Sequence, residues 1–252
     1  MPVAGCNVST TMKTPSSAER SLVAVVGPTA AGKTALSVRL ARATGGEVVS
    51  ADSRQVYRGM DIGTAKATPG EQAGVPHHLL NVLDPNQVLS LAEFQALAYA
   101  AIDDILARGR VPLLVGGTGQ YAMAVVEGWQ VPRVPPDEEL RQELYAQAER
   151  EGAAALHARL QALDPIAARR IDRRNVRRVI RALEVSLTSG RPISEQQQKA
   201  PRYHVLILGL HLPRDVLYER IDRRVEAMMA AGLEGEVRRL VAAGYSFDLP
   251  AM

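Results

Sequence analysis

Four short, largely apolar runs recur along the chain, separated by stretches with helical periodicity. They fall at 22–26, 47–50, 111–115 and 203–210, and the first three stop at polar or glycine-rich sequence. Runs of this length that are rich in valine, isoleucine and leucine are typical of buried strands in a parallel sheet. Strands that alternate with helices predict an α/β fold with right-handed crossovers.

Three helices are predicted around these strands. One follows Lys33 and ends near Gly45, because glycine is favoured just past a helix C-terminus. The second opens on the capping-box sequence SLAE at 90–93 and runs to about residue 108. The third covers 215–231.

The stretch 131–200 breaks this alternation. It opens with the proline cluster VPRVPP and then shows helical periodicity without a convincing strand. We therefore expect an α/β core formed by 21–130 and 201–252, a helical insertion at 131–200, and a disordered leader at 1–20. In the insertion, one helix face is expected to carry Val176, Val179, Ile180, Leu183 and Leu187, and another Arg170, Arg174, Arg177 and Arg181.

Composition limits the class of protein. With 252 residues, of which 46% are hydrophobic, the chain can bury a sizeable core. It holds no apolar run of about 18 residues, so we expect no membrane span and a cytoplasmic location. Cys6 is the single cysteine, which excludes an intramolecular disulfide and a cysteine-based zinc site within this sequence.

Positive charge is concentrated in one segment. The net charge is only +3, but RRIDRRNVRRVIR at 169–181 holds seven arginines against one acid, Asp172. Such a local field predicts an anionic partner. The alternative is a solvated helix face whose arginines pair with acids elsewhere.

GPTAAGKT at 27–34 fits the phosphate-binding pattern GxxxxGK[ST], between a predicted strand and a predicted helix. In that setting the backbone N–H groups of the loop surround an anion at the helix N-terminus. Lys33 would add a positive charge, and the Thr34 hydroxyl would be a ligand for Mg²⁺. The predicted pyrophosphate-binding residues of this P-loop are Gly27, Thr29, Ala30, Ala31, Gly32, Lys33 and Thr34.

The acid that usually accompanies a P-loop is missing after the strand at 111–115, which runs into GGTGQY. Asp52, at the end of the second strand, faces the same crevice, because ligands bind at the carboxyl ends of parallel strands. Its alternative role is a turn or helix cap. Two classes fit: a small-molecule kinase that binds ATP, and a transferase whose loop holds a departing pyrophosphate while Asp52 activates a nucleophile.

Four blocks, in this order and spacing, carry a family resemblance: GPTAAGKT, SADSRQVYRGMDIGTAK, VPHHLLNVLDP and LLVGGTGQY. The later segments RRNVRRVIRALEV and LYERIDRRVEAMMAAGLEGEV agree with them. Over 22–252 the sequence closely resembles the tRNA dimethylallyltransferases, also called tRNA isopentenyltransferases. The resemblance implies transfer of the dimethylallyl group of dimethylallyl pyrophosphate to the exocyclic N6 amine of the adenosine 3′ of a tRNA anticodon, with release of pyrophosphate.

The resemblance also implies roles for single residues. Asp52 would be the catalytic base, with Lys33 and the Thr118 hydroxyl at the reacting centre; Thr118 is otherwise a turn residue in a glycine-rich loop. In the predicted last helix, Arg220 and Arg224 could reach the pyrophosphate or pair with Glu219 and Asp222 at the surface, and Arg224 is the favoured pyrophosphate contact. The residues expected to contact the anticodon stem-loop are Asp52, Ser53, Arg54, Gln55, Arg141, Arg177, Arg178 and Arg181.

Alternatives of other classes remain. An adenylate isopentenyltransferase would prenylate free AMP, ADP or ATP, a P-loop kinase would transfer a phosphoryl group, and a non-catalytic module would only bind tRNA. The long arginine run argues against a free nucleotide as acceptor. The family continues past Leu249, so a C-terminally truncated member is expected, acting as a monomer.

Overall fold

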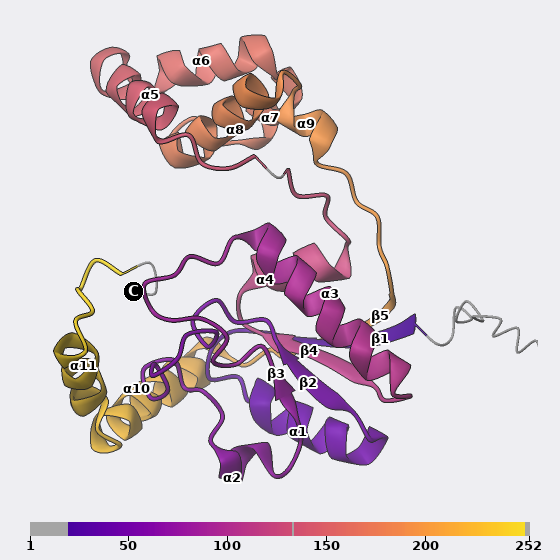
Figure 1. The fold of residues 1–252 in the computed structure, drawn as a ribbon. Helices are drawn as coiled ribbons and strands as arrows, with labels where there is room; N and C mark the ends of the chain where they lie inside the picture. Colours follow the sequence, from indigo (N-terminus) through magenta and orange to yellow (C-terminus); the bar gives the residue numbers. More distant parts are fainter. Residues whose placement is uncertain (1–19, 133, 250–252) are drawn as a thin grey trace, which may run out of the picture.

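A five-stranded parallel sheet forms the centre of the computed structural model, which describes residues 20–132 and 134–249. The strands are β1 (Ser21–Val26), β2 (Glu47–Ser50), β3 (His77–His78), β4 (Pro112–Gly116) and β5 (His204–Gly209), in the order β3-β2-β4-β1-β5. The predicted α/β class is confirmed (Figure 1). Apart from Arg20, the predicted disordered leader lies outside the described residues.

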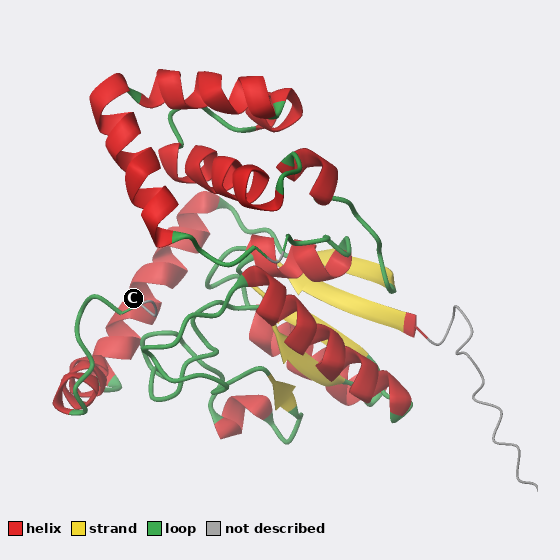
Figure 2. Cartoon of the chain, turned by 45° about the horizontal axis from the view of Figure 1, so that its top comes forward, coloured by secondary structure: helices red, strands yellow, loops and turns green. Residues whose placement is uncertain are grey.

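Helices cover both faces of the sheet (Figures 1 and 2). Alternate residues of β1 point to opposite faces, so Leu22 packs with α3 (Leu91–Ala107) and α4 (Gly119–Val126), whereas Val25 packs with α1 (Lys33–Thr44). The predicted capping box is present, since Ser90 and Glu93 each accept a backbone N–H from the other. The sheet is thus the middle of three layers.

The prediction that the run 203–210 is a buried strand is only partly right. The run 203–210 forms a strand, but it is not buried: Leu206 is 60% exposed and Ile207 is 48% exposed. β5 pairs only with β1 among the described strands and is the edge of the sheet. Apolar content alone does not distinguish an edge strand from a central one. The next helix, α10 (Arg214–Ala230), buries none of its residues, and α11 (Leu233–Ala242) follows it.

The helical insertion is a separate cluster above the sheet, joined to it by two chain segments (Figure 1). It contains α5 (Glu138–Glu151), α6 (Ala153–Leu163), α7 (Pro165–Arg170), α8 (Val176–Ser189) and α9 (Ile193–Gln196). Its own apolar core includes Leu144, Leu156, Leu160, Ile180 and Leu183. The connecting segments pair through an antiparallel bridge between Trp129 and Lys199.

The sequence predicts that the arginine run lies on one helix face, and this prediction is wrong. Arg170 ends α7, Arg174 lies in the following turn, and α8 begins at Val176. The Asn175 side chain accepts the backbone N–H of Arg178 and caps the new helix. Leu187, expected on the apolar face, is 39% exposed.

A short helix, α2 (Pro69–Gln72), lies between β2 and β3 and opens on a second capping box. Within the part of the chain that the structure describes, no helix is long and apolar enough to cross a membrane.

Candidate active site

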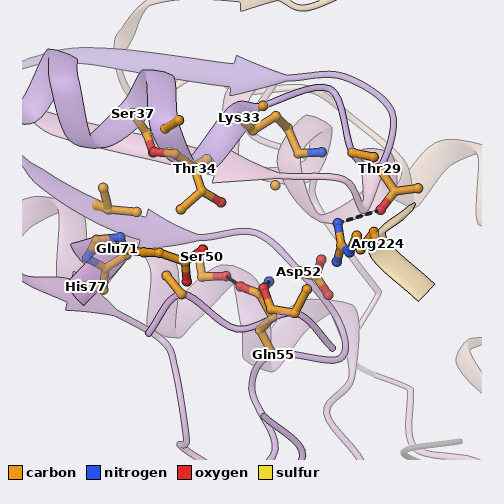
Figure 3. Close-up of a pocket in the computed structure, with 18 residues that line it drawn as sticks. Thr29, Lys33, Thr34, Ser37, Ser50, Asp52, Gln55, Glu71, His77 and Arg224 are labelled. Carbon is orange, nitrogen blue, oxygen red and sulfur yellow. Dashed lines mark hydrogen bonds between the residues drawn. The ribbon is translucent and has the colours of Figure 1, made fainter. Parts of the chain in front are cut away.

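Three loops meet at one edge of the sheet because β2, β4 and β1 are neighbours. The P-loop follows β1, Asp52 follows β2, and Thr118 follows β4. The P-loop, Asp52 and the end of β4 border a pocket of about 450 Å³, whereas Thr118 is not among its lining residues (Figure 3). This is the crevice in which parallel α/β sheets bind their ligands.

The P-loop has the conformation that its sequence predicts. Gly32 has φ +92° and caps α1, a backbone conformation that residues with a side chain rarely adopt. Ala30 is also left-handed, with φ +59°. Of the predicted pyrophosphate-binding residues, Thr29, Ala30, Gly32, Lys33, Thr34 and Arg224 line the pocket. Gly27 and Ala31 belong to the same loop but are not among the lining residues.

Lys33 extends along the pocket wall. Its Nζ donates to the carbonyl oxygens of Gly27 at 3.0 Å and of Pro28 at 2.8 Å. Burial lowers the pKa of Lys33, Asp52 opposes this, and Arg224 adds to it, so all three charges share the site. The wall therefore brings two cations close to the Asp52 carboxylate.

Arg224 reaches the P-loop from α10, almost 200 positions along the chain. Its Nη1 donates to Thr29 Oγ1 at 3.1 Å (Figure 3). Arg220, the alternative raised by the sequence, is exposed and does not line the pocket. The structure thus brings Arg224, and not Arg220, to the predicted pyrophosphate position.

Thr118 lies beside the Asp52 segment because the two strands approach closely. A Cβ at Gly116 would lie 2.0 Å from the Ala51 carbonyl oxygen, so β4 must end in glycine. Thr118 Oγ1 accepts the backbone N–H of Ser53 at 3.0 Å and donates to Ser53 Oγ at 3.3 Å. Asp52 Oδ1 accepts the backbone N–H of Arg54 at 2.9 Å, and the Asp52 side chain lines the pocket.

Gln55 closes the floor of the pocket. It accepts from Ser50 Oγ at 3.2 Å, and its Nε2 donates to the carbonyl oxygens of Thr64 and Ala65 at 3.2 and 3.3 Å. Its neighbour Arg54 is exposed. The residues 52–55, which the sequence predicts to contact tRNA, are called the acceptor segment below. Of these four residues, Asp52 and Gln55 line the pocket.

The four arginines of the insertion that are predicted to contact tRNA lie outside the pocket. Two of them form ion pairs with a buried carboxylate, and two are exposed. Arg141 Nε and Arg181 Nη1 bind the carboxylate of Glu184, at 2.8 and 2.6 Å. Glu184 is fully buried. Arg177 and Arg178 are exposed on α8, and neither forms an ion pair within the described residues. The first pair therefore satisfies a buried charge, whereas the second presents charge to solvent.

Sequence reasoning missed several pocket residues: Ser37, Ser50, Glu71 and His77. The capping-box pattern of Thr68 and Glu71 could have located α2, but not its place beside the P-loop. His77 Nδ1 lies 2.8 Å from the Val75 carbonyl oxygen, and burial lowers the pKa of this ring.

The donor set suits a hard divalent cation. Thr34, Ser50 and Asp52 contribute hydroxyl and carboxylate oxygens to one pocket, and Mg²⁺ prefers oxygen ligands. Among the described residues there is no group of three or more histidines, cysteines and acids, so a protein-only cage of that kind is not formed there. The oxygens present fit an ion bound jointly by protein and substrate phosphates.

Fold and site together define a class. A P-loop after β1 of a parallel sheet, a carboxylate after β2, and no acid after β4 describe a P-loop group-transfer enzyme. The family model described as IPP transferase matches residues 55–252, and a second, described as Isopentenyl transferase, matches residues 20–82. The chain belongs to the IPP transferase family.

The names of similar proteins support this family assignment. A "tRNA dimethylallyltransferase" from Roseiflexus sp. (strain RS-1) is 61% identical over 92% of this chain and 76% of its own length. One of the same name from Chloroflexus aurantiacus is 62% identical over 92% and 78%. The chain thus spans about three quarters of these relatives.

Solved structures agree as well. The tRNA isopentenylpyrophosphate transferase of Bacillus halodurans matches with a TM-score of 0.61 and 48% identity, over 89% of this chain and 71% of that one. A eukaryotic dimethylallyltransferase described as acting on tRNA matches with a TM-score of 0.73 and 29% identity, over 89% and 56%. These matches cover both the core and the insertion.

Proposed function

We propose that this chain transfers the dimethylallyl group of dimethylallyl pyrophosphate to the exocyclic N6 amine of an adenosine in tRNA and releases pyrophosphate. One observation carries the proposal: Asp52 shares a pocket with the P-loop, while β4, the strand beside β1, ends in glycine and is followed by Gly117 and Thr118 and not by an acid. This arrangement suits a reaction in which Asp52 activates a nucleophile that attacks a carbon atom. The family membership of the chain supports the same reaction.

Asp52 would act on the acceptor. The lone pair of an adenine amine is delocalised into the ring, so the amine is a weak nucleophile. As the bond from N6 to C1 of the dimethylallyl group forms, one N6 proton passes to the Asp52 carboxylate. Thr118, fixed through Ser53, would place its hydroxyl at this reacting centre.

The P-loop would act on the leaving group. When the bond from C1 to the bridging oxygen breaks, its electron pair stays on the pyrophosphate. The loop N–H groups, Lys33 and Arg224 would stabilise this growing negative charge, and both side chains line the pocket. Mg²⁺, held by Thr34 and the phosphates, would supply further charge neutralisation when bound.

The insertion would hold the tRNA. An adenosine in a single-stranded loop can leave its stack at a modest cost and enter a pocket. We propose the adenosine 3′ of the anticodon as the target, with Ser53, Arg54 and Gln55 beside it. Arg177 and Arg178 are exposed and suited to phosphate contacts. Monomeric action and a cytoplasmic location stay predictions.

The free-nucleotide alternative is not favoured. The Isopentenyl transferase model matches residues 20–82 only, whereas relatives that match 92% of the chain are named for tRNA. A free nucleotide also gives no role to the exposed arginines of α8.

An acceptor panel tests the proposal. The protein is incubated with Mg²⁺, dimethylallyl pyrophosphate labelled in the prenyl group and, separately, unmodified tRNA, AMP and ATP. Label is expected in tRNA alone. Label in AMP or ATP would move the assignment to a nucleotide prenyltransferase, and label in no acceptor would oppose the proposal.

A further inference from the structure

Helix α11 packs on the loop that follows the acceptor segment. Its buried residues are Glu236 and Leu240. A Cβ at Gly63 would lie 3.1 Å from Leu233 Cδ1, and one at Gly59 would lie 3.6 Å from Leu240 Cδ2. The packed face of α11 thus consists of positions i, i+3 and i+7, which share one side of a helix.

Glu236 forms the polar centre of this contact. Its Oε2 accepts the backbone N–H groups of Asp61 and Ile62, both at 2.8 Å, and its Oε1 accepts that of Gly63 at 2.9 Å. The residue is only 4% exposed, and within the described part of the chain it has no ion-pair partner. A buried carboxylate is costly unless it is hydrogen-bonded. The carboxylate therefore holds three consecutive amides in one orientation.

The same loop reaches the active-site pocket. Ala65 N–H donates to the Ile62 carbonyl at 2.9 Å, which folds the loop back on itself. The carbonyl oxygens of Thr64 and Ala65 accept the two hydrogen bonds from Gln55. Gln55 and Ala65 line the pocket (Figure 3). A continuous set of contacts therefore runs from Glu236 to the floor of the pocket near Asp52.

We infer that Glu236 is a positioning residue for the acceptor side of the active site. By holding the amides of 61–63, it fixes the carbonyl groups that orient Gln55, and so shapes the surface on which the target adenosine lies. The P-loop side does not use this contact, because the Lys33 ammonium is held by the carbonyl oxygens of Gly27 and Pro28, and α1 is capped by Gly32. This inference rests on the proposed function.

Glu236→Gln tests it with little change in shape. The variant replaces an acceptor oxygen by an NH₂ group that faces backbone donors, so at least one charge-assisted hydrogen bond is lost. We expect kcat/KM for tRNA to fall about tenfold or more, while KM for dimethylallyl pyrophosphate stays within about twofold. The matched control is Glu234→Gln on the same helix, which removes only an exposed pair with Arg238 and should leave both values unchanged.

Two further measurements separate positioning from general destabilisation. Amide hydrogen exchange at 61–63 should be faster in Glu236→Gln than in Glu234→Gln, and this readout does not require activity. Gly63→Ala keeps every hydrogen-bonding group but presses the loop against Leu233, and it should reduce kcat/KM for tRNA selectively as well. If wild type labels no acceptor, the proposed function fails while the exchange result still stands. The inference would be overturned if amide exchange at 61–63 were the same in Glu236→Gln as in Glu234→Gln. It would also be overturned if the kinetic values for tRNA and for dimethylallyl pyrophosphate worsened equally.

Discussion

The backbone N–H of Ser53 donates a hydrogen bond of 3.0 Å to Thr118 Oγ1, although 65 positions separate the two residues. This contact joins the loop after β4 to the loop after β2, directly next to Asp52. It makes the position of Thr118 depend on that of the proposed base, and it leads to the first prediction.

Thr118→Val keeps the shape of the side chain but removes the acceptor for the Ser53 N–H, and an unsatisfied buried donor costs about 1–3 kcal/mol. We expect kcat to fall about tenfold or more, whereas Thr118→Ser should stay close to wild type. Single-turnover transfer of labelled prenyl to tRNA measures both variants. Equal rates for valine and wild type would show that the hydroxyl has no part in the reaction.

Asp52→Asn removes the proposed base without changing its size. General-base groups contribute about 10²–10⁴ in rate, so kcat should fall within that range while the affinity for dimethylallyl pyrophosphate is retained. Asp222→Asn, an exposed site on α10, is the control. Steady-state kinetics with a separate pyrophosphate-binding assay checks this. A full rate in Asp52→Asn would contradict the assignment.

Arg177→Ala and Arg178→Ala should weaken tRNA binding and leave the melting temperature unchanged, because both side chains are exposed. Each lost phosphate contact should reduce the slope of log K against log salt by about 1. Binding titrations at several salt concentrations measure this slope. An unchanged slope would mean that these arginines do not contact phosphates.

Arg181→Ala should act mainly on stability. It leaves the buried Glu184 with Arg141 and the backbone N–H of Asp137, and loss of such a hydrogen bond costs about 1–3 kcal/mol. The urea midpoint should fall, whereas Arg177→Ala serves as the neutral comparison. A stable Arg181→Ala protein that no longer binds tRNA would assign this residue to recognition instead.

Acid should destabilise the core through Glu47. Hydrogen bonds from Arg108, and then from His78, lower the pKa of this buried carboxyl from 4.5 to about 2, against the opposing effect of burial. Because the folded pKa is depressed, the stabilisation is complete above about pH 4.5 and is lost as the pH falls toward 2. Melting temperatures measured across this window should fall more steeply for wild type than for Glu47→Gln.

Local patterns predicted the parts of the fold that depend on neighbouring residues. The P-loop, the capping box at Ser90, and the strand at 47–50 follow from a few consecutive side chains. The place of Asp52 beside the P-loop also followed, because parallel strands bring their carboxyl ends together.

Contacts between distant segments could not be predicted from these patterns. Nothing near Arg141 shows that it pairs with Glu184, 43 positions away, and nothing near Glu236 indicates amides 173 to 175 positions away. The exposure of β5 depends on which strands lie beside it, which an apolar run does not encode. Whether a charged side chain is exposed to solvent or forms an ion pair depends on contacts that exist only in the folded chain.

A doubly labelled substrate tests the central claim most directly, because it shows which group moves. Dimethylallyl pyrophosphate carrying tritium in the prenyl group and ³²P in the phosphates is incubated with the protein, Mg²⁺ and tRNA, and the products are separated. We predict tritium in an adenosine of the tRNA and ³²P in free pyrophosphate. Phosphorus label joined to the acceptor, with tritium left in solution, would contradict this account and indicate phosphoryl transfer.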